Sequence, residues 1–516
     1  MNIKNRKTII FSTIFFLVLI FFSVIYHFLN IVDDASHKDG KRDNYFNQVV
    51  KKIVPQNIKN FAKDKIFVFE RVKILEAEKI QFQKDNLSLM NQASGYNFNF
   101  VSSKKKKLGE IDIILSTYNL PFLKKTGPRS YFAYNNKKLF LITGNGLLMY
   151  SSLKNIQKNL LNFKVINSNI KKLITKNYSP VSYLPGTPQP YLGINISTTI
   201  VKNILVHEEK IYISYVKKVN EECYMNAILV SEPLHLHGEE IISQMHQDEE
   251  QESKELSFQN FFETKECQLT PVQPGGNLSN YTKNKILLTV GSYAVHEKIE
   301  HKSKNNAQNL KSLTGKILSI DTINKSHQIL SSGHRNSQGL FYDKKYGSIY
   351  STDHGPQGGD EVNIKNSSDS EIKNFGWPIS SYGEHYGYPD FKGPGQENNQ
   401  TYYENSPLYK SHSKYGFVEP LKYFVPSIAP TQIIKTEEFI KVLNKNVIYI
   451  GALGNNVKEG DLSIHQFILS DSFKLEQHNI LPIGERVRDL IYIPELKKIF
   501  LFLESTASIG VLEVVN

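Results

Sequence analysis

The chain has 516 residues, of which 40% are hydrophobic, 11% aromatic and 22% charged, and this balance excludes a disordered chain, a collagen and a polytopic membrane protein. The 2 cysteines exclude a disulfide-rich scaffold and a cysteine-rich zinc or iron–sulfur site. The formal net charge of +12 is spread thinly along the chain, so it does not predict a nucleic-acid groove.

An apolar run near the N-terminus gives the first structural signal. Residues 9–32 contain no Lys, Arg, Asp or Glu, and about 20 such residues cross a bilayer as a helix. Basic residues precede the run and two aspartates follow it, which places the N-terminus in the cytoplasm. We therefore predict a cytoplasmic tip and one transmembrane signal anchor over residues 1–32, in the inner (cytoplasmic) membrane, with the main body in the periplasm or outside the cell. A cleaved signal peptide is the alternative.

The next segment, residues 33–105, is rich in Lys, Asn and Gln and predicts a tether and an irregular cap. The four-lysine run Lys104–Lys107 at its end is interpreted as a solvent-exposed loop. Further along, Cys223 and Cys267 either form a disulfide in the exported body or remain separate thiols, and the sequence leaves both alternatives open.

From residue 106 to residue 516, short β-branched or aromatic strands recur between turn residues. Six apolar strands lead the repeated units, and each has a partner strand after it. The leading strands are 138–143, 210–216, 285–291, 347–352, 446–453 and 498–504, and their partners are 146–152, 226–232, 316–321, 361–365, 462–469 and 509–514. Six units predict an all-β, six-bladed β-propeller. One or two ordinary β-sandwiches are the alternative.

A histidine-rich cluster lies inside this region. On a strand, His235 and His237 would face the same way, and with Glu239 and Glu240 they would suit a metal. The cluster adjoins an acidic, Gln-rich insertion at 239–255, so an exposed loop is the preferred interpretation.

Two polar loops in the second half carry the residues best suited to chemistry. The stretch 333-GHRNSQG-339 places Arg335, Asn336 and Gln338 on one short loop, with guanidinium and amide donors for an anionic, carbonyl-rich ligand. The stretch 353-DHGPQGGDEVNI-364 combines free carbonyls with Asp360 and Glu361, and these are oxygen ligands that calcium prefers. The segment 375-FGWPISSYGEHYG-387 follows and holds the only tryptophan of the chain.

Taken in order, these motifs resemble the pattern of the soluble aldose sugar dehydrogenases, also called glucose/sorbosone dehydrogenases. That pattern is G-H-R-N-x-Q-G, then E/D-H-G-P-x-G-G-D-E-[IV]-N, then N-[YF]-G-W-P, and looser similarity covers residues 270–516. The resemblance implies a propeller that uses pyrroloquinoline quinone (PQQ) and Ca²⁺ to oxidise a sugar or related alcohol, with hydride transferred to the quinone. The anchor would keep such an enzyme beside a respiratory electron acceptor.

The resemblance also implies roles for individual residues. Arg335, Asn336 and Gln338 would contact PQQ, with Arg335 facing the reactive quinone carbonyl. Arg486 and Arg488 would bind its carboxylates, which suits bidentate guanidinium chemistry.

The implied calcium site lies in the second motif. Gly355 and Pro356 would supply backbone oxygens to the ion that also touches PQQ. Asp360 and Glu361 would support that loop or a second, structural calcium.

Two departures from the family pattern concern catalysis. The histidine that removes the proton from the sugar hydroxyl is replaced by Gln273, which cannot act as a base, and the arginine that follows it is replaced by Asn277. The position of the cofactor-binding lysine of some family members holds Gly454. These losses favour an alternative function, a catalytically impaired propeller that binds a carbohydrate or an envelope ligand.

Another base would have to replace the lost histidine if the enzyme is active. His334, Asp353 and His354 are the candidates that the sequence offers near the first two motifs.

Overall fold

The computed structural model describes residues 96–515, apart from gaps at 121–122, 124–128, 158–160, 179–199, 238–239, 243–254, 294–305, 357, 384–410, 441–444, 455 and 457–459. All of the described residues belong to one compact unit, Ser94–Asn516. The predicted anchor at 1–32 and the predicted tether up to residue 95 lie outside them. No helix in the described part of the chain is long and apolar enough to cross a membrane.

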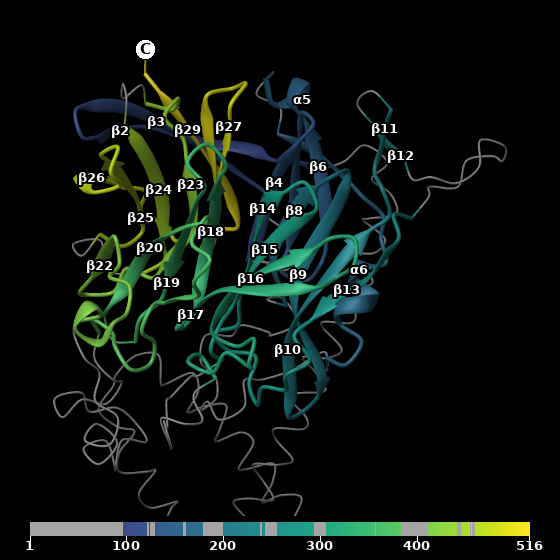
Figure 1. Cartoon of the computed structure of the whole chain (residues 1–516). Coiled ribbons are helices and arrows are strands. Elements are labelled where there is room, and N and C mark those ends of the chain that lie inside the picture. Colours follow the sequence, from purple (N-terminus) through teal and green to yellow (C-terminus); the bar gives the residue numbers. More distant parts are fainter. Residues whose placement is uncertain are drawn as a thin grey trace, which may run out of the picture. The chain divides into compact units, whose positions relative to one another are not determined.

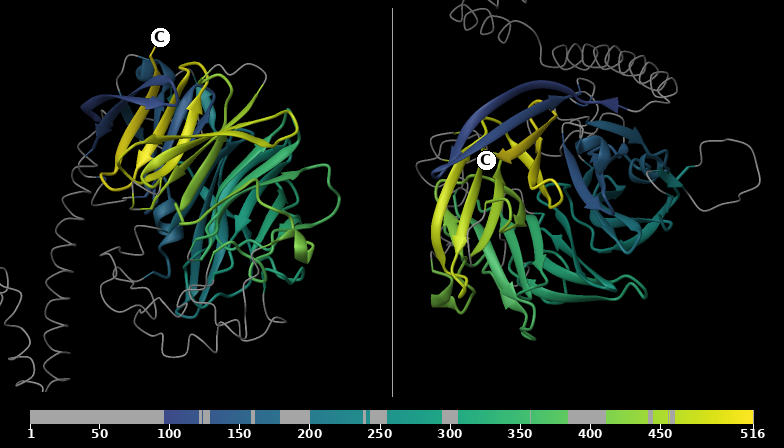
Figure 2. Two further views of the ribbon diagram at one scale, coloured as in Figure 1. Left: turned by 90° about the vertical axis from the view of Figure 1, so that its left-hand side faces the viewer. Right: turned by 90° about the horizontal axis from the view of Figure 1, so that it is seen from above.

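Six sheets form the body of this unit, and each sheet begins with an innermost strand (Figures 1 and 2). The innermost strands are β4 (Ser130–Asn135), β8 (Val201–His207), β14 (Gly275–Thr282), β18 (Ser337–Asp343), β23 (Pro430–Lys435) and β27 (Val487–Ile493). Each of these contacts the innermost strand of the next sheet, and β27 contacts β4 in turn. The ring is therefore closed, and the predicted six-bladed propeller is confirmed.

The second and third strands of the blades match the predicted repeats. The second strands are β5 (Lys138–Thr143), β9 (Lys210–Asn220), β15 (Lys285–Val290), β19 (Ser348–Asp353), β24 (Asn446–Ala452) and β28 (Lys498–Leu503). The third strands are β6 (Leu148–Ser152), β10 (Cys223–Ser231), β16 (Lys316–Asp321), β20 (Asp360–Asn366), β25 (Ser463–Leu469) and β29 (Ser508–Val514). Every leading strand of the sequence pattern is thus the second strand of a blade.

The outer strands complete the blades. The fourth strands are β7 (Asn162–Val165), β13 (Phe258–Glu263), β17 (His327–Ser332), β22 (Lys422–Phe424), β26 (Leu475–Pro482) and β3 (Ile111–Asn119). Three blades carry a further edge strand, which is β1 (Tyr96–Asn97), β2 (Asn99–Leu108) or β21 (Lys373–Asn374). The named helices of the described residues are short: α5 (Leu153–Gln157), α6 (Ile170–Ile174) and the 3₁₀ turn η3 (Ser413–Tyr415).

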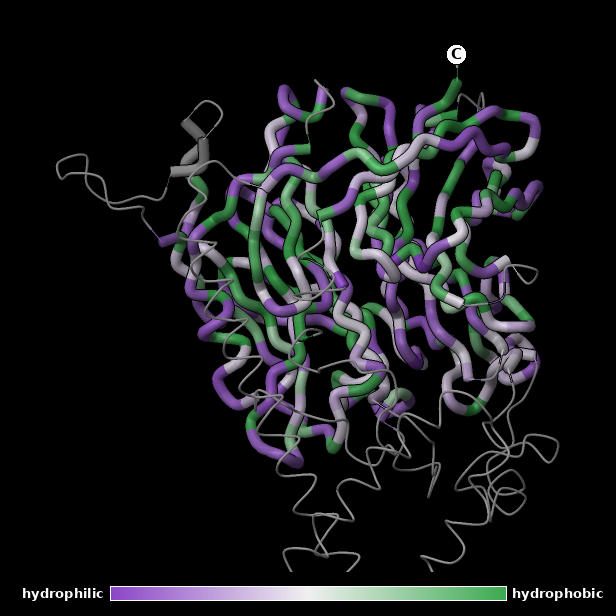
Figure 3. Tube along the Cα trace, turned by 180° about the vertical axis from the view of Figure 1, so that it is seen from behind, coloured by the Kyte–Doolittle hydropathy of each residue, from purple (hydrophilic) through white to green (hydrophobic). Residues whose placement is uncertain are grey.

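The second strands are mostly buried because neighbouring blades cover both of their faces. All seven residues of β24 are buried. One apolar cluster joins residues of β5 and β6 to residues of β28 and β29, and therefore spans the first and last blades. Figure 3 shows hydrophobic stretches along the strands and many hydrophilic residues at the turns. A single blade would expose these faces to water, so the stacking of blades stabilises the fold.

The last blade combines both ends of the described chain. Its strand β29 pairs antiparallel with β3, with Ser508 opposite Asn119, and β3 pairs in turn with β2. The first strands of the propeller therefore begin at Tyr96, ten residues before the predicted boundary at 106. Because β3 and β29 lie at opposite ends of the described chain, no local sequence pattern predicts that they pair.

The lysine run 104–107 lies in β2 and not in a loop, so that prediction is wrong. β2 is the edge strand of its sheet, and Lys105 and Lys107 lie 2.7 and 3.3 Å from the carboxylate of Asp112. Exposed lysines on an edge strand oppose pairing with another chain.

The sequence left the state of the two cysteines open and favoured an exposed loop for the histidine-rich stretch. Cys223 and Cys267 form a disulfide, which joins β10 to the segment after β13. The histidine-rich stretch is not a loop but a short hairpin, in which β11 (His235–His237) pairs with β12 (Glu240–Ile242).

Candidate functional site

The first residues of the innermost strands gather at one end of the ring. Side chains there bond to the backbone of the neighbouring strand, which joins the start of each blade to the next. Such pairs are Asp489 Oδ2 with Phe132 N at 2.6 Å, Thr431 Oγ1 with Val487 O at 2.8 Å, and Asn277 Nδ2 with Gln338 O at 2.8 Å. The predicted site residues all lie at or near these strand starts, although up to about 200 residues separate them along the chain.

Asp353, the last residue of β19, organises the loop that leads into β18. Its buried carboxylate accepts hydrogen bonds from Arg335 N at 3.2 Å, Asn336 N at 2.6 Å and Ser337 Oγ at 3.0 Å. His334 Nδ1 lies 3.1 Å from the same carboxylate, and its Nε2 lies 2.8 Å from Ser331 Oγ. With this many partners, Asp353 and His334 hold the loop in place and are poor replacements for a catalytic base.

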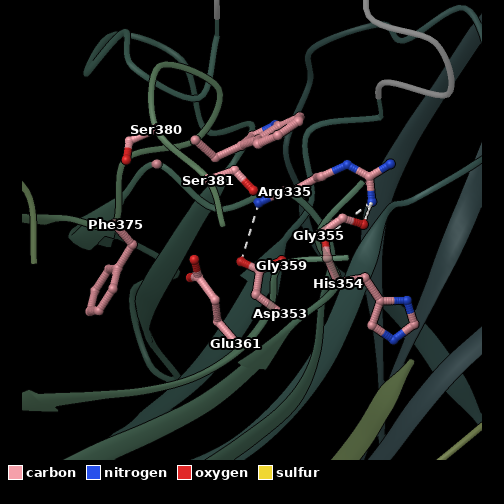
Figure 4. Close-up of a pocket in the computed structure, with 11 residues that line it drawn as sticks. Arg335, Asp353, His354, Gly355, Gly359, Glu361, Phe375, Ser380 and Ser381 are labelled. Carbon is pink, nitrogen blue, oxygen red and sulfur yellow. Dashed lines mark hydrogen bonds between the residues drawn. The ribbon is translucent and has the colours of Figure 1, made fainter. Parts of the chain in front are cut away.

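Arg335 projects from this loop into a small pocket (Figure 4). Its Nη1 donates to the carbonyl of His354 at 3.1 Å and to that of Gly355 at 2.6 Å. The guanidinium carbon lies 5.3 Å from the ring centre of Trp377, within the range of a cation–π interaction. The arginine is therefore fixed beside the predicted calcium loop.

Asn336 and Gln338 face the neighbouring blade. Asn336 Oδ1 accepts from Gln338 Nε2 at 2.9 Å and from Gly275 N at 3.2 Å. The Asn277 side chain bonds to the Gln338 carbonyl, so the residue that replaces the family arginine ties β14 to β18. These amides form a hydrogen-bond network between the blades of β14 and β18.

The predicted calcium loop is tightly folded around Gly355. A Cβ on Gly355 would lie 2.3 Å from the Gly358 carbonyl oxygen and 2.4 Å from that of Gly359, so no larger residue fits there. Asp360 accepts from Gly355 N at 2.8 Å, and from Ile428 N at 2.8 Å with its other oxygen. Burial raises the pKa of Asp360 to about 6. Its oxygens are occupied by the chain itself, so Asp360 supports the loop.

Glu361 has a different position, with its carboxylate in the pocket and directed toward Ser380 and Ser381 (Figure 4). Its Oε1 lies 3.2 Å from His412 Nε2, and its Oε2 accepts from Asn363 Nδ2 at 3.1 Å. The described residues contain no group of three or more His, Cys, Asp and Glu side chains that could hold a metal. The Gly355 carbonyl, which accepts from Arg335 Nη1 at 2.6 Å, and the Glu361 carboxylate are hard oxygen donors of the kind that Ca²⁺ prefers, and they would supply two of the about six to eight ligands that the ion takes.

Gln273 lies two residues before β14 with a backbone φ of +54°, and its carbonyl accepts from Tyr293 N at 3.2 Å. The side-chain Oε1 is buried and has no hydrogen-bond partner within the part of the chain that the structure describes. A buried acceptor without a donor is unfavourable. The position therefore suits a ligand that donates a hydroxyl hydrogen bond.

His354 is the third candidate base. Its Nε2 lies 2.7 Å from the Pro430 carbonyl, so it carries the proton and donates it. Burial, the largest cause, together with the Arg335 and Arg488 charges lowers the pKa of His354 to about 4. The imidazole is thus neutral and weakly basic, and the charges of two cationic groups, one at Arg335 and one at Arg488, oppose its protonation.

The second of these groups forms around Glu504, the residue that follows β28. Arg488 Nε and Arg486 Nη2 both bond to its carboxylate, the latter at 3.3 Å, and Arg129 Nε lies 3.7 Å from it. Arg486 also donates to the Leu453 carbonyl. Burial by itself would raise the pKa of Glu504. The charges of Arg488 and Arg129 outweigh this effect and lower the pKa to about 2.

Lys202, the second residue of β8, belongs to the same neighbourhood. Burial, Arg129 and Arg488 lower its pKa to about 7, whereas Glu504 acts in the opposite direction. We refer to Arg129, Lys202, Arg486, Arg488 and Glu504 as the cationic cluster. Sequence reasoning found only Arg486 and Arg488, because the other three residues belong to no motif.

Comparison with known proteins identifies a family model and two curated relatives that match this chain. The family model described as Glucose / Sorbosone dehydrogenase matches residues 201–509. An uncharacterized protein of Synechocystis sp. is 27% identical over 37% of this chain and 43% of its own length. The aldose sugar dehydrogenase YliI of Escherichia coli is 28% identical over 32% of this chain and 46% of its own length. The chain thus spans less than half the length of these curated relatives.

Solved structures show the same fold at lower sequence identity. A crystal structure of glucose dehydrogenase is 17% identical with a TM-score of 0.51, and covers 81% of this chain and 100% of its own. The apo-form of the soluble aldose sugar dehydrogenase from Escherichia coli is 18% identical with a TM-score of 0.50, and covers 76% and 97%. The family model matches more than half of the chain and includes both polar loops of the site. The chain therefore belongs to the glucose/sorbosone dehydrogenase family.

Proposed function

We propose that this chain is a membrane-anchored, exported dehydrogenase that oxidises a sugar or a related alcohol with PQQ and Ca²⁺. The observation that carries the proposal is the meeting of Arg335, the Gly355 loop and the cationic cluster at one end of the ring. Family membership supports a small-molecule sugar substrate. The predicted anchor and the Cys223–Cys267 disulfide, a bond typical of exported proteins, support the proposed location in the inner membrane with the body outside the cytoplasm.

The cofactor would be held by donors that are already in place. Arg335 lies beside the aromatic face of Trp377 and is positioned for a quinone carbonyl, while Arg486 and Arg488 would bind carboxylates. The Gly355 and Pro356 carbonyls would hold Ca²⁺, and of the predicted calcium residues Gly355 and Glu361 line the pocket. Bound PQQ would supply the hydride acceptor.

Oxidation of a sugar also requires a base that removes the proton from its hydroxyl group, and the candidate residues suit this role poorly. The Gln273 amide accepts a hydrogen bond and orients a hydroxyl, but it does not take up the proton. The side chains of His334 and Asp353 are already hydrogen-bonded to other groups of the chain, and the pKa of His354 is lowered to about 4. None of the three is therefore a suitable base. A positioned base typically contributes about 10²–10⁴-fold, so we expect slow turnover.

The same observation favours a second candidate function, in which the propeller binds a carbohydrate or another envelope ligand without oxidising it. The buried Gln273 Oε1 suits sugar recognition whether or not catalysis follows.

A titration separates the two functions. The purified full-length chain is titrated with PQQ in the presence of Ca²⁺, and the quinone absorbance is followed before and after the addition of a panel of aldoses. Saturable PQQ binding and slow reduction by an aldose are expected. Aldose binding in a calorimeter without PQQ binding would refute the dehydrogenase proposal and support the second function.

A further inference from the structure

We propose that Lys316 is a positioning residue of the site: its buried ammonium group holds residues 306–314 against Trp377, and Trp377 in turn helps to fix the guanidinium of Arg335. We refer to residues 306–314 as the 306–314 loop. The inference rests on the proposed function only for the role of Arg335 toward a cofactor. Lys316 is the first residue of β16 and belongs to neither of the two polar loops that the sequence predicts as the site.

The ammonium group of Lys316 uses its three donors on backbone carbonyls. Its Nζ donates to Asn306 O at 2.7 Å, to Ala307 O at 3.0 Å and to Thr314 O at 2.7 Å. These acceptors lie at the two ends of the 306–314 loop, so one side chain joins its beginning to its end. Lys316 is 0% exposed, and a lysine is rarely buried to this extent unless its charge is satisfied by partners.

A carboxylate on the same loop supports the charge of the lysine. Glu266 Oε1 accepts from Leu313 N at 2.6 Å, and its Oε2 accepts from Ser312 Oγ at 2.5 Å and Thr314 Oγ1 at 3.0 Å. Burial lowers the pKa of Lys316 to about 8, and the charge of Glu266 acts in the opposite direction. The side chain is therefore mainly an ammonium ion at pH 7 and retains all of its donors.

The 306–314 loop lies directly against Trp377. Ala307 and Trp377 form a buried apolar pair, with 1% and 4% of their surfaces exposed. Gln308 Nε2 donates to the Trp377 carbonyl at 2.6 Å, and its Oε1 accepts from Asn374 Nδ2 at 2.7 Å. The loop thus contacts both the side chain and the backbone of the tryptophan.

The loop also contacts the segment that carries Arg335. The Ala307 carbonyl, one of the three acceptors of the lysine, accepts from Gly333 N at 3.0 Å as well, and Gly333 O accepts from Trp377 N at 3.0 Å. Gly333 lies two residues before Arg335, whose guanidinium carbon is 5.3 Å from the ring centre of Trp377. Loss of the ammonium group would therefore release Trp377 and weaken one contact of Arg335.

Trp377 is the only tryptophan of the chain, so its fluorescence reports on this position directly. The full-length wild-type and Lys316→Met chains are compared by tryptophan emission and by acrylamide quenching, without PQQ. Methionine keeps an apolar stem but donates no hydrogen bond, so three buried carbonyls lose a donor. We expect the emission of the variant to move to longer wavelength and its quenching to become stronger. With Ca²⁺ present, the variant should bind PQQ about tenfold more weakly, as expected for loss of a cation–π contact.

Lys365→Met is the matched control for the removal of a buried ammonium group. Lys365 is also buried, and its Nζ donates to the carbonyls of Asn366 at 2.9 Å and Asp369 at 3.1 Å. It lies near the end of β20 that is opposite to Asp360. We expect both lysine variants to be less stable in urea, but only Lys316→Met to differ from the wild type in emission, quenching and Kd for PQQ.

A second variant tests the loop without changing the lysine. Gln308→Met removes the hydrogen bond to the Trp377 carbonyl and should also alter emission and quenching. In the Lys316→Met background the same substitution should add little, because the loop has already separated from Trp377, whereas in the Lys365→Met background it should keep its full effect. If Lys316→Met does not fold, Lys316→Gln, which has a shorter side chain with an amide donor, takes its place.

The inference is overturned if Lys316→Met has the emission and quenching of the wild type, if Gln308→Met does not alter them, or if the effects of the two substitutions simply add. An altered tryptophan signal with an unchanged Kd for PQQ overturns the step from Trp377 to Arg335. Absence of PQQ binding by the wild type refutes the proposed function instead. The tryptophan measurements need no cofactor, so they still decide whether Lys316 positions Trp377.

Discussion

Replacement of Glu504 by Gln removes the negative charge at the centre of the cationic cluster while keeping the shape of the side chain. The pKa of this carboxyl falls from 4.5 to about 2 in the folded chain. Each pH unit corresponds to about 1.4 kcal/mol, so the ionised carboxylate contributes about 3 kcal/mol to the free energy of unfolding at neutral pH. Because the folded-state pKa is depressed, this contribution is present above about pH 4.5 and is lost as the pH falls toward 2.

Urea denaturation of the wild-type and Glu504→Gln chains at pH 7 and pH 3 measures this difference. We expect the variant to be less stable by about 3 kcal/mol at pH 7, and the difference to shrink at pH 3. Glu513→Gln serves as the matched control, since Glu513 is half exposed and pairs with Lys498 at 2.8 Å. An exposed pair contributes less than about 1 kcal/mol. Equal losses for both variants at pH 7, or a loss for Glu504→Gln that does not depend on pH, would refute the electrostatic reasoning.

Three predictions concern the ligands. Arg486→Ala should weaken PQQ binding far more than Gln273→Ala does, because it leaves a carboxylate without its guanidinium; equal Kd values by absorbance titration would contradict this. Gln273→His should raise the rate of sugar-dependent quinone reduction, since a neutral imidazole restores a base and His tolerates the positive φ of this position. An unchanged rate in a stopped-flow assay would argue against placing residue 273 beside the sugar hydroxyl. Excess chelator should lower the Tm if Gly355 and Pro356 hold Ca²⁺, because a ligand at a hundredfold excess over Kd stabilises by about 2.7 kcal/mol; an unchanged Tm would remove calcium from the proposal.

The blades and the two polar loops could be predicted because their signals are local. A second strand such as β24 is covered on both faces, so all of its residues are buried and most of them are apolar. The Gly355 loop has a motif of fixed spacing, because its close backbone contacts admit glycine alone. The sequence therefore predicts the site residues of these two loops.

Other features depend on contacts between distant parts of the chain. Lys104–Lys107 reads as a loop, yet the lysines belong to a strand because β3 offers an unpaired edge. His334 and Asp353 have the side chains of catalytic bases, but their hydrogen bonds with each other and with the loop backbone show a structural role. The type of a residue does not reveal which hydrogen-bond partners its side chain has in the folded chain.

By itself the sequence determined the number of blades, the strands within them and the position of the two ligand loops, since hydrophobic periodicity and turn residues are local properties. Only the tertiary structure brought Arg129 and Lys202 next to Arg488 and Glu504, because closure of the ring places the starts of β4, β8 and β27 at the same end. The charges of these side chains influence one another strongly there because burial removes the water that would screen them. The lowered pKa of Lys202 therefore arises from the closed ring and from no segment of the chain alone.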